Sequence, residues 1–225
     1  MTDVRADPAA GLAAQAHGLR EAFGRYDERA VHGLLDAAFA AHRVAVVVDD
    51  LVFPFLRELG DAWERGEVSV AQEHWASGLV RGRLVGLASA LAAGRPVPPR
   101  GTAVLACPTY ERHDIGLLAL DLVLRERGWD SVFLGADTPV DAAVELALDR
   151  DADVLVLCGS EPHMYDAQLE AAAEDLARLA GRTTIALAGR AATAQLAERH
   201  AGLLLPLSTV PAADLVDGTL RGVPA

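Results

Sequence analysis

The chain has 225 residues and a formal net charge of -12 at pH 7, and 52% of its residues are hydrophobic while only 5% are aromatic. This length suits one large or two small domains, and the apolar content excludes a disordered chain. The bias toward Ala, Leu and Val favours helices and buried parallel strands, and the acidic balance argues against direct binding to nucleic acid.

The sequence shows no sign of secretion or membrane insertion. No apolar run approaches the roughly 18 residues of a membrane span, and the chain does not open with a signal sequence. Cys107 and Cys158 fall at the ends of predicted buried strands, where a cysteine acts as a small apolar side chain. We therefore expect a cytoplasmic protein with no membrane contact and no disulfide framework.

The first part of the chain predicts a flexible arm over residues 1–18 and a helical domain over residues 19–94. The arm is rich in Ala, Gly and short polar residues, so only its later part is expected to be helical. Apolar positions between Leu19 and Ala41 recur at helical spacing, with Asp27 as the N-cap between two helices.

Two further helices complete a predicted four-helix bundle. One covers residues 44–63 and contains Pro54, which should kink it or mark a start because proline lacks an N–H donor. The other covers residues 69–93 and opens with a capping box formed by Ser69 and Gln72. Four helices with short connections are typical of a bundle.

A Pro- and Gly-rich linker over residues 95–101 separates this bundle from a second domain over residues 102–225, in which short apolar runs alternate with helical patterns. The alternation predicts a flavodoxin-like (Rossmann-like) doubly wound sheet of five parallel strands. The predicted strands are Ala103 to Cys107, Ser131 to Leu134, Val154 to Cys158, Thr184 to Ala188 and Leu203 to Leu205. The helices are expected to begin near Asp114, Pro139, Asp166, Ala191 and Ala212, with Thr138 as the N-cap before Pro139.

The loop after the first predicted strand carries Glu111, His113 and Gly116, spaced as acid-x-His-x-x-Gly. In an open α/β sheet, ligands bind beyond the carboxyl ends of the strands. A histidine just before a helix N-terminus is favoured in its neutral, metal-binding form, and a carboxylate two residues away can hold its other ring N–H. Gly116 leaves room for a bulky group. The triplet alone is equally compatible with an ordinary surface histidine in a loop.

The run Glu111-Arg-His113-Asp114-Ile-Gly116 resembles the cobalamin-binding signature of the methionine synthase and methylmalonyl-CoA mutase class of domains. The resemblance implies that His113 is the metal ligand, coordinating cobalt from below. Later parts of that signature match in part, because Ser160 alone offers a hydroxyl at the end of the third strand and Gly189 follows an alanine instead of a second glycine. With Asp114, Gly135 and Thr138 these residues form the predicted cofactor site.

Two other occupants of this fold were tested against the same loops. A phospho-receiver needs an aspartate at the end of the third strand, where Cys158 stands. A flavin mononucleotide site needs a loop rich in Ser and Thr after the first strand, and Pro108-Thr-Tyr-Glu111 does not supply one. Both alternatives fail on residues, which leaves a cobalt ligand at His113 as the best interpretation.

A second constellation, Trp63 followed by Glu73 and His74, lies in the predicted bundle. Taken alone, Trp63 reads as a core aromatic and the other two as solvated residues of a first helical turn. The spacing resembles the light-sensing cobalamin-binding domain of the CarH class of photoreceptors over residues 25–225. The resemblance implies that these three side chains cap the 5'-deoxyadenosyl group on the upper face of cobalt, between the bundle and the sheet.

The chain departs from that class in two ways. The MerR-type helix-turn-helix DNA-binding domain that those repressors carry ahead of the bundle is not found, and Glu64 stands where they have a histidine directly after the Trp. Related stand-alone sensors, the photocobilins, pair cobalamin with biliverdin, and the missing histidine would leave room for that second chromophore. No bilin-attachment cysteine is evident.

The sequence therefore predicts a photoreceptor and not an enzyme, with adenosylcobalamin as cofactor and biliverdin as an optional second chromophore. A homodimer and a protein partner for the signalling output are expected. The alternatives are a corrinoid methyl carrier, which has to expose its methyl group to partner methyltransferases, and a mutase small subunit, which would not need the bundle.

Overall fold

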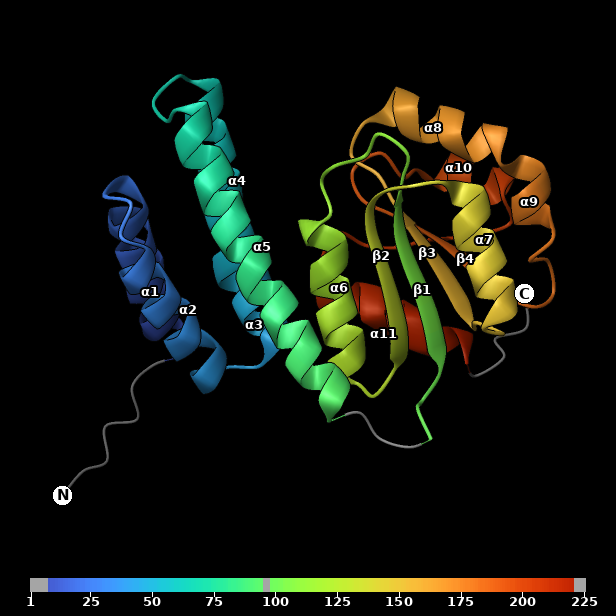
Figure 1. Ribbon diagram of the computed structural model, residues 1–225, viewed down its shortest axis with the longest axis horizontal. Coiled ribbons are helices and arrows are strands. Elements are labelled where there is room, and N and C mark those ends of the chain that lie inside the picture. Colours follow the sequence, from blue (N-terminus) through green and yellow to red (C-terminus); the bar gives the residue numbers. More distant parts are fainter. Residues whose placement is uncertain (1–7, 95–97, 221–225) are drawn as a thin grey trace. The chain divides into compact units, whose positions relative to one another are not determined.

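The computed structural model describes residues 8–94 and 98–220, and the chain forms two compact units, Met1–Gly86 and Leu87–Ala225 (Figure 1). The division lies within the last helix of the first unit. The predicted boundary was the linker at residues 95–101, of which residues 95–97 lie outside the described part of the chain.

The first unit is the predicted helical domain. Its elements are α1 (Pro8–Gly24), α2 (Glu28–Ala41), α3 (Val44–Val47), the π-helical turn η1 (Val48–Val52), α4 (Phe53–Glu64) and α5 (Val70–Ala93). The Asp27 carboxylate accepts the N–H of Ala30 at 3.0 Å and caps α2, as predicted. Ser69 and Gln72 form the reciprocal capping box, because each side chain accepts the other residue's backbone N–H.

Residues 8–18 of the predicted arm form most of α1, so the helix expected only in the later part of the arm already begins at Pro8. This segment is rich in alanine, the best helix former, and it carries apolar side chains at helical spacing. Leu12 and Leu19 are both buried, so packing stabilises a helix that composition alone suggested would fray. Residues 1–7, the rest of the predicted arm, lie outside the described residues.

The predicted helix over residues 44–63 is present as the continuous run α3, η1 and α4. Pro54 stands in the first turn of α4, where its missing N–H costs little. The π-helical turn η1 lies directly before α4 and is a local widening of the helical backbone. Val48, Leu51 and Phe55 are buried along this run and form part of the core of the unit.

The second unit is the predicted five-stranded sheet. Its strands are β1 (Thr102–Pro108), β2 (Asp130–Thr138), β3 (Val154–Cys158), β4 (Thr184–Ala188) and β5 (Leu203–Leu204), all parallel and in the order β2-β1-β3-β4-β5. This is the flavodoxin-like order, with its topological switch point between β1 and β3. Cys107, the residue before the last of β1, and Cys158, the last residue of β3, are buried free cysteines.

Helices cover both faces of this sheet (Figure 1). They are α6 (Ile115–Glu126), α7 (Val140–Asp149), α8 (Pro162–Ala171), α9 (Ala173–Ala177), α10 (Ala194–Arg199) and α11 (Thr209–Thr219). Side chains alternate along β1, so Val104 and Ala106 join the core formed with α7 to α10. Within residues 8–94 and 98–220, no helix has the length and apolar character that spanning a bilayer requires.

Three predicted helix starts in this unit are wrong by about one turn. The helix α8 starts at Pro162 instead of Asp166, because a proline fits the first helical position. The helix α10 starts at Ala194, capped by the hydroxyl of Thr193, and α11 starts at Thr209. Thr138 is not the N-cap of α7, since it is the last residue of β2 and Pro139 occupies the cap.

Candidate functional site

Glu111, His113 and Ser160 come together beyond the carboxyl ends of β1 and β3. The Oε1 atom of Glu111 lies 2.7 Å from His113 Nδ1 and accepts the His113 backbone N–H at 2.8 Å. The Oε2 atom accepts both the backbone N–H and the hydroxyl of Ser160, at 2.6 and 2.7 Å. The sequence predicted the contact between Glu111 and His113, and it did not predict that Ser160 would complete the cluster.

The electrostatics of this cluster keep Glu111 ionised. Burial raises the pKa of this carboxyl, but the hydrogen bonds from Ser160 and His113 outweigh it and bring the pKa down to about 2. A carboxylate can only accept, so we assign the proton on the imidazole to Nδ1. That tautomer leaves Nε2 as a lone-pair donor, on a side chain that is 72% exposed. The arrangement is the one in which a second residue orients a metal-binding histidine.

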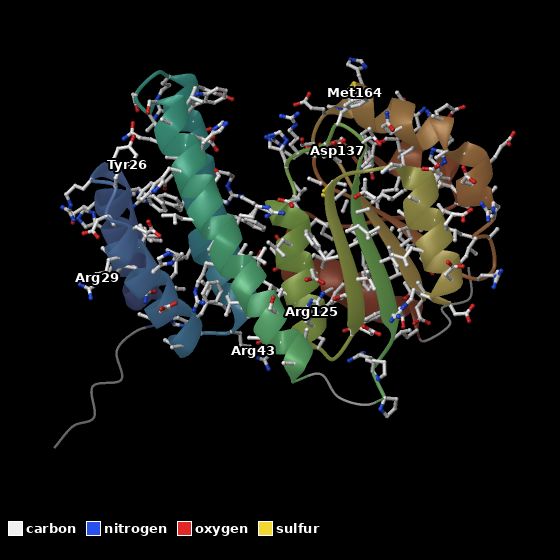
Figure 2. The ribbon with its side chains drawn as sticks, in the orientation of Figure 1. Tyr26, Arg29, Arg43, Arg125, Asp137 and Met164 are labelled. Carbon is white, nitrogen blue, oxygen red and sulfur yellow. The ribbon has the colours of Figure 1, made fainter. Side chains whose placement is uncertain are left out.

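The loop that carries Glu111 is fastened to the carboxyl end of β2 by Asp137, a residue that sequence reasoning missed. The Asp137 carboxylate accepts the N–H of Tyr110 at 2.7 Å, and the Asp137 backbone N–H donates to the carbonyl of Glu111 at 3.0 Å. Both Tyr110 and Asp137 have positive φ, at 71° and 54°. Asp tolerates this conformation better than most residues, so an Asp at this position was the sequence signal for a positive φ. Figure 2 shows Asp137 and Met164 near the same edge of the sheet.

Asp114 and Gly135 pack against each other beside this cluster. Asp114 is the buried N-cap residue of α6. Gly135 has a φ of 79°, and a Cβ there would lie 3.2 Å from the Phe133 ring and 3.5 Å from the Asp114 carboxylate. It stands at an irregularity in the pairing of β1 with β2. Both residues therefore shape the loops of the predicted site from within.

The remaining predicted residues of this unit differ in their surroundings. The hydroxyl of Thr138 donates to the carbonyl of Gly135 at 3.3 Å. Gly116 faces open space at the start of α6, which fits its predicted role of leaving room. Gly189 has a φ of 86°, and a Cβ there would lie 2.2 Å from the carbonyl oxygen of Gly159. It therefore lets the loop after β4 touch the residue directly before Ser160.

The side-chain donors of this cluster fit a metal ion whose other coordination positions are already filled by a cofactor. Within the part of the chain that the structure describes, no group of three or more His, Cys, Asp or Glu side chains could hold a metal ion. A bare zinc or magnesium site is therefore not built from these residues. One exposed imidazole with an oriented Nε2 suits a macrocyclic metal centre that lacks a single axial ligand.

The three predicted residues of the helical unit are available at its surface. Trp63, in the last turn of α4, is 45% exposed, so it is not the core aromatic that the simpler interpretation assumed. A second tryptophan of the unit, Trp75, is half-buried, and its ring contacts Phe23 at 5.4 Å and Tyr26 at 5.0 Å between centroids.

Glu73 and His74 lie in the first turn of α5 and make contacts within that helix. Glu73 accepts the hydroxyl of Ser77 at 2.6 Å and lies 2.7 Å from Nδ1 of His74, whose side chain is 75% exposed. Each carboxylate oxygen keeps a second lone pair, so Glu73 can still accept a ligand hydroxyl. The five-residue turn after α4 brings these residues to the same end of the unit as Trp63.

Two segments of the chain match known families, both described as B12 binding domain, over residues 15–85 and 101–203. The HTH-type transcriptional repressor CarA of Myxococcus xanthus is 37% identical over 147 residues, which are 64% of this chain and 48% of the relative. The repressor CarH of the same organism is 39% identical over 116 residues, 52% of this chain and 38% of the relative. The chain thus spans about half or less of the length of the curated relatives it matches.

The fold is also found in a solved structure, the monomethylamine corrinoid protein of Methanosarcina barkeri. It superimposes with a TM-score of 0.70 at 18% sequence identity, covering 89% of this chain and 95% of that one. At this identity the likeness supports the fold alone, a helical domain followed by a Rossmann-like sheet.

Proposed function

Two segments of this chain match B12 binding domain families and the chain is homologous to CarA and CarH, and from this premise we propose that it is a light sensor that binds adenosylcobalamin and not an enzyme. The cluster of Glu111, His113 and Ser160 carries the proposal. In it, His113 Nε2 is the lower axial ligand of cobalt. Glu111 fixes the tautomer and the orientation of the ring, and Ser160 keeps Glu111 ionised and in place.

The helical unit covers the upper face of the cofactor in this proposal. Trp63 supplies an exposed apolar surface for the adenosyl group, and Glu73 supplies acceptors for its ribose hydroxyls. The bound cofactor supplies a cobalt–carbon bond that light can cleave. A ligand shifts a conformational equilibrium only as far as it binds one state better. Loss of the adenosyl group therefore changes the arrangement of the units only if contacts such as that with Trp63 distinguish the two states.

The experiment is an absorption spectrum of the protein mixed with adenosylcobalamin in darkness, repeated after green light. We expect the wild type to give a spectrum of bound adenosylcobalamin in darkness that is lost on illumination. The His113→Ala variant should not reproduce this dark spectrum. A dark complex that is unchanged by light would rule out the sensor. Repeating the titration with biliverdin tests the second chromophore, which adds a long-wavelength band only if it is bound.

Self-association is the way in which such a sensor would signal. We propose a homodimer in darkness that changes on illumination, together with a protein partner in the cytoplasm that reads the change. Light scattering of the adenosylcobalamin complex before and after light measures this directly. A monomer under both conditions would exclude it.

A corrinoid methyl carrier is the second candidate, favoured by the fold that the chain shares with the Methanosarcina barkeri corrinoid protein. A carrier has to present its methyl group to another protein, so it gains nothing from contacts that favour an adenosyl group. Affinities for adenosylcobalamin and methylcobalamin separate the two functions. The sensor binds the adenosyl form more tightly and loses that preference in Trp63→Ala, whereas a carrier shows no such preference.

A further inference from the structure

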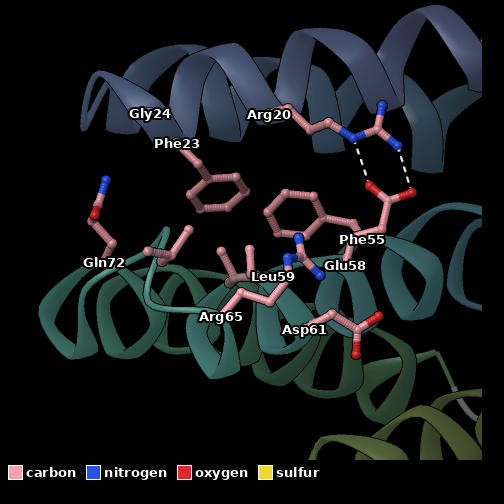
Figure 3. A pocket seen from close by; sticks show the side chains of 11 residues that line it. Arg20, Phe23, Gly24, Phe55, Glu58, Leu59, Asp61, Arg65 and Gln72 are labelled. Carbon is pink, nitrogen blue, oxygen red and sulfur yellow. Dashed lines mark hydrogen bonds and ion pairs between the residues drawn. The ribbon is translucent and has the colours of Figure 1, made fainter.

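The helical unit contains a pocket that the proposed function does not use. It has a volume of about 450 Å³ and lies between α1 and α4, with the turn before α5 and Gln72 closing one end (Figure 3). None of Trp63, Glu73 and His74 is among its lining residues. Its size falls in the range of about 300 to 1,000 Å³ that is usual for small-molecule sites.

The walls of the pocket are apolar and partly aromatic. The rings of Phe23 and Phe55 stack at 4.5 Å between centroids with an interplanar angle of 20°. Figure 3 shows these rings side by side, one from α1 and the other from α4. Leu59, Ala62 and Val68 add aliphatic surface. Such a lining favours flat, apolar ligands, because aromatic faces and edges offer stacking in addition to burial.

The charges at the rim are balanced within the protein. Arg20 forms a bidentate ion pair with Glu58, at 2.6 and 2.8 Å, and the dashed lines in Figure 3 mark it. Arg65, the other arginine of the lining, is held by Glu67 at 3.0 and 2.8 Å. Asp61 adds a further carboxylate. An anionic ligand would have to compete with these glutamates for the guanidinium groups, so an uncharged ligand is favoured.

We propose that this pocket is a binding site for an uncharged, flat, mostly apolar small molecule with a few aromatic or conjugated rings. The site belongs to the helical unit alone and does not require corrinoid binding. Its ligand inserts between α1 and α4, against the stacked rings of Phe23 and Phe55.

The test uses the full chain and N-phenyl-1-naphthylamine, an uncharged probe, with 8-anilino-1-naphthalenesulfonate as the probe that differs by one sulfonate. Binding is measured by calorimetry. We expect the uncharged probe to bind at one site and about tenfold or more tightly than the sulfonate. Excess hydroxocobalamin should not displace it, and His113→Ala should bind it as the wild type does.

Two variants fill the pocket, Gly24→Leu and Ala62→Leu, and each should weaken probe binding by about tenfold or more. A Cβ added at Gly24 or at Gly33 would meet open space, but only Gly24 lines the pocket. Gly33→Leu is therefore the matched control and should bind the probe as the wild type does. Circular dichroism checks that each variant is folded. Undiminished binding in both filling variants, no binding to the wild type, or tighter binding of the sulfonate would overturn the proposal.

Discussion

The two units hold their predicted ligand-contacting residues in different ways. In the sheet unit, Glu111 is buried and accepts four hydrogen bonds from two residues, so His113 is oriented before any ligand arrives. In the helical unit, Trp63 is 45% exposed, and the His74 side chain is 75% exposed and lies against Glu73 of its own helix. A preorganised group binds without a further ordering cost, whereas exposed side chains are ordered by the ligand itself. The first arrangement suits retention of a cofactor, and the second suits a response to its upper ligand.

The largest expected effect comes from removing the metal ligand. His113→Ala should weaken cobalamin binding by more than about a hundredfold, because the loss of a ligand exceeds the effect of losing a residue that orients it. Binding of hydroxocobalamin measured by equilibrium dialysis gives the value. His163→Ala removes another exposed histidine of the same unit and should bind as the wild type does. Equal losses in both variants would contradict the assignment of His113.

Removing the residue that orients His113 should have a smaller effect. Glu111→Ala is expected to weaken cobalamin binding by about ten- to a hundredfold. Glu111→Gln keeps the size and one acceptor but loses the charge, so it should fall between Glu111→Ala and the wild type. The three affinities, measured by spectral titration, are expected in that order. An alanine variant with wild-type affinity would show that the cluster does not support the ligand.

The low pKa of Glu111 also predicts how stability depends on pH. Its pKa in the folded protein is about 2, below the ordinary value of 4.5. Its contribution to stability is therefore complete above about pH 4.5 and is lost as the pH falls toward 2. The difference in unfolding free energy between the wild type and Glu111→Gln should shrink over this range in urea titrations. A difference that grows on acidification would reverse the sign and contradict the assignment.

A smaller effect is expected at Asp137, which fastens the Glu111 loop. Asp137→Gly keeps the positive φ but loses the acceptor for Tyr110, and it should weaken cobalamin binding by about two- to tenfold, the value of one hydrogen bond. Asp137→Asn keeps an amide oxygen and tolerates the same backbone, so it should restore most of the affinity. Similar losses in both variants would show that the charge of Asp137, and not its hydrogen bond, is what matters.

The smallest effect on affinity is expected in the helical unit. Trp63→Ala should leave hydroxocobalamin binding unchanged and weaken adenosylcobalamin by about two- to tenfold, the value of one aromatic contact. The same variant should blunt any change in assembly or protease sensitivity on illumination. Parallel titrations of the two cobalamins give the comparison. Equal weakening of both would mean that Trp63 supports the fold of the unit instead of contacting the adenosyl group.

The sequence predicted the sheet and the His113 loop because their signals are local. Buried parallel strands read as short apolar runs, and Glu111 lies only two residues from His113. The bracing by Asp137 depends on two positive φ angles and on a hydrogen bond between residues 27 positions apart, which periodicity does not record. Likewise α1 and the ring contact of Trp75 with Phe23 depend on tertiary packing, which overrides composition.

Electron paramagnetic resonance of the cobalt(II) complex tests the central claim most directly, that Nε2 of His113 coordinates the metal. An axial nitrogen splits the cobalt lines into triplets when it is nitrogen-14 and into doublets when it is nitrogen-15. In protein labelled with nitrogen-15 histidine and loaded with unlabelled cobalamin, the account predicts doublets, which disappear in His113→Ala. Triplets that persist in the labelled protein would mean that the cofactor's own base is the ligand, and would contradict the account.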